Sequence, residues 1–164
     1  MRLQCAKHPV ALAPATGKLV AVLDIIRVKK LRDDARLPFR ATTGATGYDL
    51  YACVDEEMVV GAEPARVPTG IAIEAPEGYD VQIRPRSGLS AQGVMVTLGT
   101  IDADYRGELI VTMYALPYRE PHVIRSGDRI AQLVISRIAD VMLEEVGELA
   151  ATERGAGGHG STGR

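Results

Sequence analysis

Polar and apolar side chains alternate along several short stretches of the chain, with a period of two residues. The clearest alternation covers residues 80–84 and 108–113, and further β-rich runs cover residues 67–73, 122–125 and 130–135. Glycine and proline residues separate these runs, as they do between the strands of β proteins. The pattern therefore predicts β-strands rather than helices.

Few positions favour a helix. Residues 87–92 could form a turn or two before Gly93 ends it, and no longer amphipathic stretch is present. Many short strands with this spacing predict an all-β fold, a sandwich or barrel of jelly-roll-like form. A chain of 164 residues has room for one such domain.

The two ends of the chain differ in composition from the strand-rich part. Residues 1–22 contain lysine and arginine but no acidic residue, and a proline interrupts their apolar stretch, so they are a poor signal-peptide core. We interpret residues 1–22 as an N-terminal extension that could be disordered. Residues 23–152 are expected to form the β domain, and the glycine-rich residues 153–164 a flexible segment.

Composition excludes several classes of protein. The net charge of −2 gives no basic field for nucleic acid, and no apolar run is long enough to span a membrane. Cys5 and Cys53 have neither a metal-site spacing nor a disulfide-rich pattern. We therefore expect free thiols in a reducing compartment, the cytoplasm, and no nucleic-acid or membrane partner.

The segment of residues 99–107 is the first candidate for chemistry. Asp102, Asp104 and Tyr105 lie between two apolar strands, where a polar cluster is typical of a site. A plain β-turn with solvated aspartates explains the same residues. The segment alone leaves both interpretations open.

Two further segments carry candidate phosphate-binding groups. Arg86, Ser87 and Gly88 end a strand with a cation, a hydroxyl and a glycine, which suits an anion at the start of a short helix, although Ser87 could simply cap that helix. Gln132 interrupts an apolar run, either as an outward-facing residue or as an amide donor. Asp49 ends a loop rich in small residues.

The glycine-rich end of the chain also has two explanations. It cannot bury enough apolar surface to order itself, so it could be a floppy tail. Alternatively, consecutive glycines let backbone N–H groups converge on a phosphate, with donors added by Arg154, Ser161 and Thr162.

Taken together and in this order, the segments resemble the five motifs of the trimeric dUTPase family. The resemblance covers residues 25–163. Its motifs lie at residues 41–50, 86–89, 99–107, 127–133 and 154–163. Five ordered matches are far more specific than any one of them, and they favour the functional interpretation at each position.

The resemblance implies a hydrolase that splits dUTP into dUMP and pyrophosphate, which limits uracil in DNA and supplies dUMP for dTTP synthesis. Asp102 would activate the attacking water at the α-phosphorus, and Tyr105 would stack under the deoxyribose and exclude a 2′-hydroxyl. Backbone groups around Val96 to Ile101, including those of Gly99, Thr100 and Ile101, would pair with the uracil edge.

The resemblance also implies a homotrimer with active sites at subunit junctions and an exchanged C-terminal strand and tail. Arg86, Ser87, Gly88 and Gln132 would bind the triphosphate. Asp49 would lie near the waters of a Mg²⁺ ion that has no direct protein ligand. A neighbouring subunit would close the site with a lid that contributes Arg154, Gly158, His159, Gly160, Ser161 and Thr162.

Three departures from the family pattern stand out. His159 replaces the usual phenylalanine, which should weaken but keep the closure over the uracil ring. Ala45-Thr46 replaces the usual Ser-Ala. The hairpin expected over residues 94–99 is short and lacks an asparagine, so base recognition would depend on backbone groups.

Two other functions are considered. A related dCTP deaminase would need a glutamate on the strand after the third motif, and residues 109–114 contain no acid. A dUTPase-like binding module without activity is disfavoured because Asp102, Arg86, Gln132 and the glycine-rich end are all present.

Overall fold

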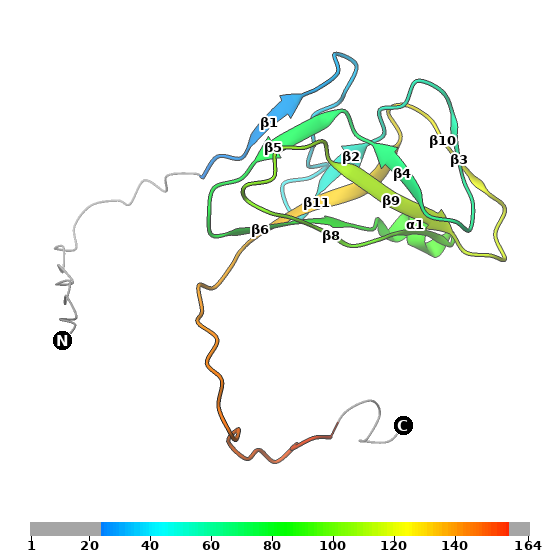
Figure 1. The fold of residues 1–164 in the computed structure, drawn as a ribbon. Coiled ribbons are helices and arrows are strands. Elements are labelled where there is room, and N and C mark those ends of the chain that lie inside the picture. The colour runs from blue at the N-terminus through cyan, green and yellow to red at the C-terminus, as the bar shows by residue number, and fades with distance from the viewer. Residues whose placement is uncertain (1–23, 158–164) are drawn as a thin grey trace.

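The computed structural model describes residues 24–157, so the expected N-terminal extension and the last part of the expected lid lie outside the described residues (Figure 1). Within that range the chain forms eleven β-strands and one short helix. In chain order they are β1 (Arg27–Lys30), β2 (Tyr48–Tyr51), β3 (Met58–Val60), β4 (Ala65–Pro68), β5 (Ile71–Glu74), β6 (Tyr79–Arg84), α1 (Ser87–Ala91), β7 (Val94–Val96), β8 (Gly99–Ile101), β9 (Ile110–Ala115), β10 (His122–Ile124) and β11 (Arg129–Arg137).

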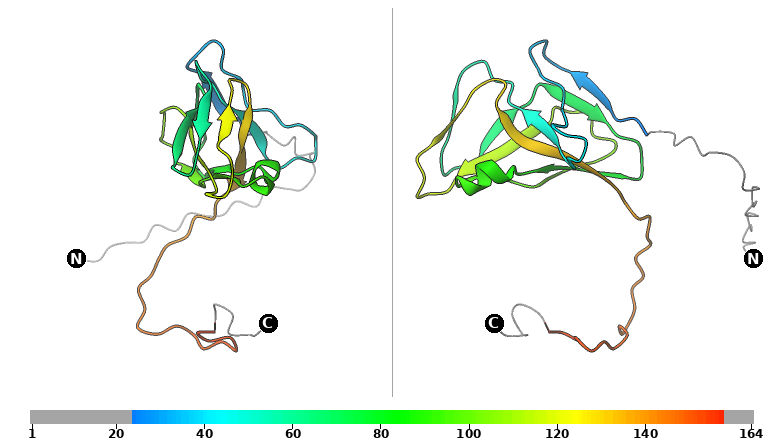
Figure 2. Two further views of the ribbon diagram at one scale, coloured as in Figure 1. Left: turned by 90° about the vertical axis from the view of Figure 1, so that its right-hand side faces the viewer. Right: turned by 180° about the vertical axis from the view of Figure 1, so that it is seen from behind.

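The strands form small antiparallel sheets that pack face to face. The largest has the order β2-β11-β6-β8, and a second has the order β4-β9-β7. Two pairs, β1-β5 and β10-β3, complete the body, whose layers are visible in the turned views (Figure 2). The all-β prediction is confirmed, with the strands wrapped as a jelly-roll-like sandwich.

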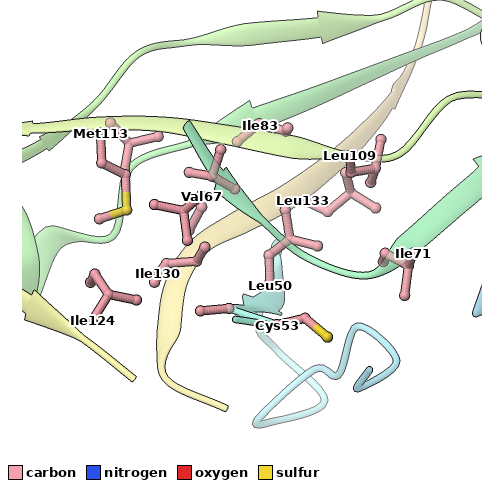
Figure 3. Packing of buried hydrophobic residues seen from close by; sticks show 14 of the residues in the cluster. Leu50, Cys53, Val67, Ile71, Ile83, Leu109, Met113, Ile124, Ile130 and Leu133 are labelled. Atoms are coloured by element: carbon pink, nitrogen blue, oxygen red, sulfur yellow. The ribbon is translucent and has the colours of Figure 1, made fainter. Parts of the chain in front are cut away.

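Alternation along the strands accounts for the core. In β9 the burial pattern alternates strictly, with Val111, Met113 and Ala115 inside. Side chains from opposite layers meet in the middle, and Figure 3 shows Leu50, Val67, Ile83, Met113 and Leu133 among them. The period-two pattern in the sequence thus predicted which face of this strand is buried.

Two local predictions had different outcomes. Helix α1 has the short length expected before Gly93, which adopts a positive φ of 77°. The hairpin expected over residues 94–99 is wrong, because β7 pairs with β9 whereas β8 pairs with β6. The residues between β7 and β8 therefore carry the chain from one sheet to the other.

An ion-pair cluster lies after β1. Arg32 Nη2 contacts Asp34 Oδ2 at 2.9 Å and Asp55 Oδ1 at 2.6 Å, and the hydrogen bonds from Arg32 lower the pKa of Asp34 to about 2. Behind it, the thiol of Cys53 is buried and unpaired within the described residues, and it donates to Asp34 Oδ1 at 3.5 Å. Burial raises the pKa of this thiol, so Cys53 is a core side chain and a poor nucleophile.

Residues 138–157 leave the body after β11 (Figure 1). Their last backbone hydrogen bond to it runs from Ile138 N to Gly78 O at 3.0 Å. Large apolar side chains of this segment face solvent, including Val141, Met142 and Leu143. No helix in residues 24–157 is long and apolar enough to cross a membrane.

Candidate active site

Strand β8 presents the third motif at the edge of the largest sheet. Its pairing with β6 sets Gly99 opposite Ile83 and Ile101 opposite Val81. The strand ends at Ile101, and a turn follows in which Tyr105 N donates to Asp102 O at 3.1 Å. Asp102 is therefore fixed at the junction of a strand and a tight turn.

A cavity of about 240 Å³ opens beside this turn. The Asp102 side chain is exposed, and within residues 24–157 its carboxylate forms no ion pair and no hydrogen bond, which leaves its oxygens available to a water or a ligand. The structure brings together most of the predicted third-motif residues around this space. The walls are formed by Arg66, Ile83, Gly99, Thr100, Ile101, Asp102, Tyr105, Glu108 and Ile110.

The ring of Tyr105 is held by one hydrogen bond and lies close to a glycine. Its hydroxyl donates to Glu108 O at 3.0 Å. A Cβ at Gly107 would overlap that hydroxyl and lie 2.9 Å from Tyr105 Cε2, so a glycine is needed where the chain passes the ring. The ring is 43% exposed and forms one wall of the cavity, where a flat ligand could stack.

Two residues of the cavity wall were not predicted. The Glu108 carboxylate accepts the N–H of Gly70 at 2.7 Å, so it is used to join two loops. Arg66 projects from β4, opposite Thr112 on β9, and is exposed. An arginine on the outer face of a strand has no distinguishing sequence signal, so only the fold reveals its place beside Asp102.

The first, second and fourth motifs meet at another place. Asp49 on β2 lies between two arginines, with Oδ1 at 3.3 Å from Arg86 Nε and Oδ2 at 3.3 Å from Arg129 Nη1. Arg86 Nη1 also donates to Arg129 O at 2.8 Å. The carboxylate is only 15% exposed, and the Arg86 side chain 26%, so this cluster is more strongly coupled than an ordinary surface pair.

Gln132 lies at the centre of the same group. It pairs with Asp49 on β2 and with Arg84 on β6, and its Nε2 donates to Pro85 O at 2.8 Å. Its side chain packs against Gly47, which precedes β2. Gln132 is thus neither buried in the core nor freely solvated, but is held by the other two motifs.

Ser87 and Gly88 form the first turn of α1. The capping role that the sequence allowed for Ser87 is wrong, because the N-cap residue is Arg86 and no side chain caps the helix. Both Ser87 and Gly88 are exposed. Both residues are therefore accessible to solvent directly after Arg86 in the chain.

Within residues 24–157, Asp49 and Asp102 line separate cavities. Asp49 and Arg129 line a space of about 470 Å³, and none of the residues around it lines the Asp102 cavity. Arg154 lies on the segment that leaves the body, where its Nε donates to Gly157 O at 2.8 Å. The remaining predicted lid residues lie outside the described range: Gly158, His159, Gly160, Ser161 and Thr162.

Comparison with known proteins agrees with the motifs. The family profile described as dUTPase matches residues 33–163. A deoxyuridine 5′-triphosphate nucleotidohydrolase of Hydrogenobaculum sp. (strain Y04AAS1) is 53% identical over 140 residues, which is 83% of this chain and 96% of that protein. The enzyme of the same description from Syntrophotalea carbinolica is 50% identical over 143 residues, which is 84% of this chain and 96% of the relative.

Solved structures give the same result. The dUTPase of Staphylococcus bacteriophage 80alpha, a mutant with dUpNHpp, superposes with a TM-score of 0.73 at 30% identity, covering 87% of this chain and 100% of that one. A mutant dUTPase from phage phi11 of S. aureus, described with a structural Mg(II) ion, has a TM-score of 0.69 at 28% identity over 76% of this chain and 98% of its own. With a matching profile over most of its length and relatives at half identity or better, the chain belongs to the dUTPase family.

Proposed function

We propose that this protein hydrolyses dUTP to dUMP and pyrophosphate, with Asp102 as the general base. The observation that carries the proposal is the cavity in which the Asp102 carboxylate, which has no partner among the described residues, and the Tyr105 ring lie beside the backbone of β8. The carboxylate could hold a water molecule, the flat ring could stack on a sugar, and the strand edge could pair with a base.

In the proposed reaction, Asp102 accepts a proton from a water molecule whose oxygen attacks the α-phosphorus. A bond forms between the water oxygen and phosphorus, and the bond from phosphorus to the oxygen bridging the α- and β-phosphates breaks. Pyrophosphate leaves with that bridging oxygen, and the remaining product is dUMP. A positioned general base typically contributes about 10²–10⁴-fold in rate.

Discrimination between nucleotides would come from the same cavity. The backbone of Gly99, Thr100 and Ile101 supplies the polar groups for the uracil edge, and Ile83 lies beneath Gly99. The hydroxyl of Tyr105 is held by Glu108 O, and in this position its ring would exclude a 2′-hydroxyl. A site that pairs its polar groups with one base can reject another by roughly 10⁴-fold.

The triphosphate would lie against the second group of residues. Arg86, Ser87, Gly88 and Gln132 supply a guanidinium, a hydroxyl, backbone N–H groups and an amide within one region. The lid proposed over residues 153–164 would add Arg154, Gly158, Ser161 and Thr162 to the phosphates and His159 and Gly160 to the nucleotide. Residues 138–157 lie away from their own body, which suits a segment that reaches another one.

A magnesium ion would be held by the substrate rather than by this chain. Both oxygens of Asp49 are engaged by arginine side chains, which disfavours direct coordination of a divalent cation but leaves lone pairs for metal-bound waters. The ion would neutralise phosphate charge and help the leaving group. Asp49 would orient its water shell.

We further propose a homotrimer in which each active site combines parts of different subunits. Support comes from the separation of the Asp102 cavity from the Asp49 cluster within one chain. A second support is a groove of about 740 Å³ between β1 and the largest sheet, whose apolar lining includes Ile26, Val28, Leu133 and Ile135. Within the described residues β1 pairs only with β5, so one edge of it is open.

The segment after β11 has the features needed to fill this groove in a neighbouring subunit. Val141 is 71% exposed and Leu143 98% exposed in the isolated chain. Glu144 and Glu145 follow them, and Arg40 and Arg137 line the groove. An exposed apolar segment and an open strand edge in the same chain favour pairing between copies.

Turnover assays with dUTP, dCTP, dTTP and UTP test the proposal. We expect pyrophosphate release from dUTP alone at low substrate concentration. Ammonia release from dCTP would indicate a deaminase, and binding of dUTP without turnover would indicate a binding module. Light scattering should give three times the mass of the chain. The cytoplasmic location stays a prediction.

A further inference from the structure

A register shift in β11 places Arg129 on the face of the sheet that carries Asp49. Gln132 lies opposite Asp49 and Ala131 opposite Leu50, but the pairing then shifts, so that Arg129 lies opposite Tyr51. Strict alternation would put residues 129 and 132 on opposite faces. The extra residue, Ile130, instead turns Arg129 toward Asp49, and bulges of this kind commonly redirect a side chain beside a site.

The redirected side chain closes a ring of three contacts. Arg129 Nη1 lies 3.3 Å from Asp49 Oδ2, Asp49 Oδ1 lies 3.3 Å from Arg86 Nε, and Arg86 Nη1 donates to Arg129 O at 2.8 Å. Arg86 is therefore restrained through two of its nitrogens. Its Nη2 forms no hydrogen bond within residues 24–157, which leaves its N–H groups for a ligand.

We propose that Arg129 is a positioning residue, which holds the Asp49 carboxylate so that the Arg86 guanidinium is aimed at the substrate phosphates. This inference rests on the proposed function, in which Arg86 binds the triphosphate. No role was assigned to Arg129 from the sequence.

Two physical effects support this role. First, a carboxylate bound by one guanidinium can rotate about its side-chain bonds, whereas one bound on both oxygens is fixed, which favours a preorganised phosphate site. Second, Asp49 and Arg86 alone sum to zero charge, and the addition of Arg129 leaves the cluster with one net positive charge for the phosphates. The Arg129 side chain is 52% exposed, so its own pair with Asp49 contributes little to folding.

The test is a double-mutant cycle on the whole chain, in which calorimetry measures the affinity of each variant for dUpNHpp. The variants are Arg129→Gln, Arg129→Lys, Arg86→Gln and the double variant Arg86→Gln/Arg129→Gln. Arg125→Gln is the matched control, because Arg125 forms an exposed pair with Glu57 at 2.6 Å away from these contacts. The affinity for deoxyuridine, which has no phosphate, is measured by its competition with dUpNHpp.

We expect Arg129→Gln to weaken dUpNHpp binding roughly tenfold, the size of one charged hydrogen bond. Arg129→Lys should keep most of the affinity because it retains the charge toward Asp49. In the Arg86→Gln background, Arg129→Gln should add almost nothing, since the residue acts through Arg86. Deoxyuridine binding and the melting temperature should stay as in the Arg125→Gln control.

Three results would overturn the inference. The first is an unchanged affinity of Arg129→Gln for dUpNHpp. The second is independent losses of affinity in the double variant, which would make Arg129 a direct phosphate ligand. The third is an equal loss of deoxyuridine binding, which would indicate a scaffold role. If the unmodified protein binds dUpNHpp but does not turn over dUTP, the proposed hydrolysis fails while the cycle still decides about Arg129. If it does not bind dUpNHpp, both proposals fail.

Discussion

The side chain of Gln132 packs directly on Gly47. A Cβ at position 47 would overlap Gln132 Oε1 and would lie 3.1 Å from both Cβ and Cδ of that residue. The glycine therefore lets β2 approach β11 closely enough for the Gln132 amide to reach Pro85 O. A residue from the first motif sets the position of one from the fourth.

Replacing Gly47 by alanine should displace Gln132. Overpacking of this kind costs about 1–3 kcal/mol in the free energy of unfolding, and loss of the amide position should raise KM for dUTP. Urea unfolding and steady-state kinetics measure the two effects. The matched control is Gly44→Ala, where a Cβ would meet nothing within 4 Å. Equal behaviour of the two variants would contradict the packing argument.

Asp102→Asn should bind dUpNHpp normally and lose most turnover. The substitution keeps the volume of the side chain but removes the group that accepts the proton, so we expect kcat to fall about 10²–10⁴-fold. Calorimetry and single-turnover kinetics separate binding from chemistry. Retention of full activity would exclude Asp102 as the base.

Gly107→Ala should weaken the exclusion of ribonucleotides. A Cβ there would lie 2.9 Å from Tyr105 Cε2 and would push the ring out of its place in the cavity wall. We expect the ratio of kcat/KM for dUTP to that for UTP to fall roughly tenfold, as one contact is lost. Gly61→Ala, with open space around its Cβ, is the control. A preserved ratio with a displaced ring would rule out Tyr105 as the sugar filter.

Deletion of residues 153–164 should lower kcat with little effect on stability. The described part of this segment is nearly all exposed, and its hydrogen bonds join only residues 152–157. Loss of closure is expected to reduce turnover on the order of 10²-fold, because the triphosphate is no longer held in position. Thermal unfolding and kinetics test this. A large fall in the melting temperature would instead assign the segment to the folded core.

Stability at low pH should depend on Asp34. Its pKa is lowered in the folded protein from 3.8 to about 2, chiefly by the hydrogen bonds from Arg32. A lowered carboxyl pKa stabilises the fold above the unfolded value near 4, and this contribution is lost as the pH falls toward 2. Asp34→Asn should therefore destabilise the protein at pH 7 more than at pH 2.5 in urea unfolding. Asp33→Asn, whose carboxylate has no ion pair within the described residues, should show no such difference.

Much of the fold was predictable because burial leaves a periodic trace in the sequence. The alternation in residues 108–113 identified the inner face of β9, and Gly93 marked the end of α1. Strand partners leave no such trace. The hairpin expected over residues 94–99 came from the family resemblance, but the two strands bond to different sheets.

The candidate site was predictable only where motif order supplied information. Asp102, Tyr105 and the backbone of β8 were named from the third motif and lie around one cavity. Arg66 lines the same cavity because β4 pairs with β9, and this pairing has no local signal in the sequence. The position of Arg129 likewise depends on a register shift that no residue type in the sequence indicates.

The bulge at Ile130 makes the number of residues between Arg129 and Gln132 a part of the site. Without this bulge, a regular strand with the same three-residue separation would turn the Arg129 guanidinium toward the core while Gln132 kept its place, and a buried cation without its carboxylate is strongly destabilising. The backbone irregularity at Ile130, rather than any single side chain, therefore decides which side of the sheet carries the charge of Arg129.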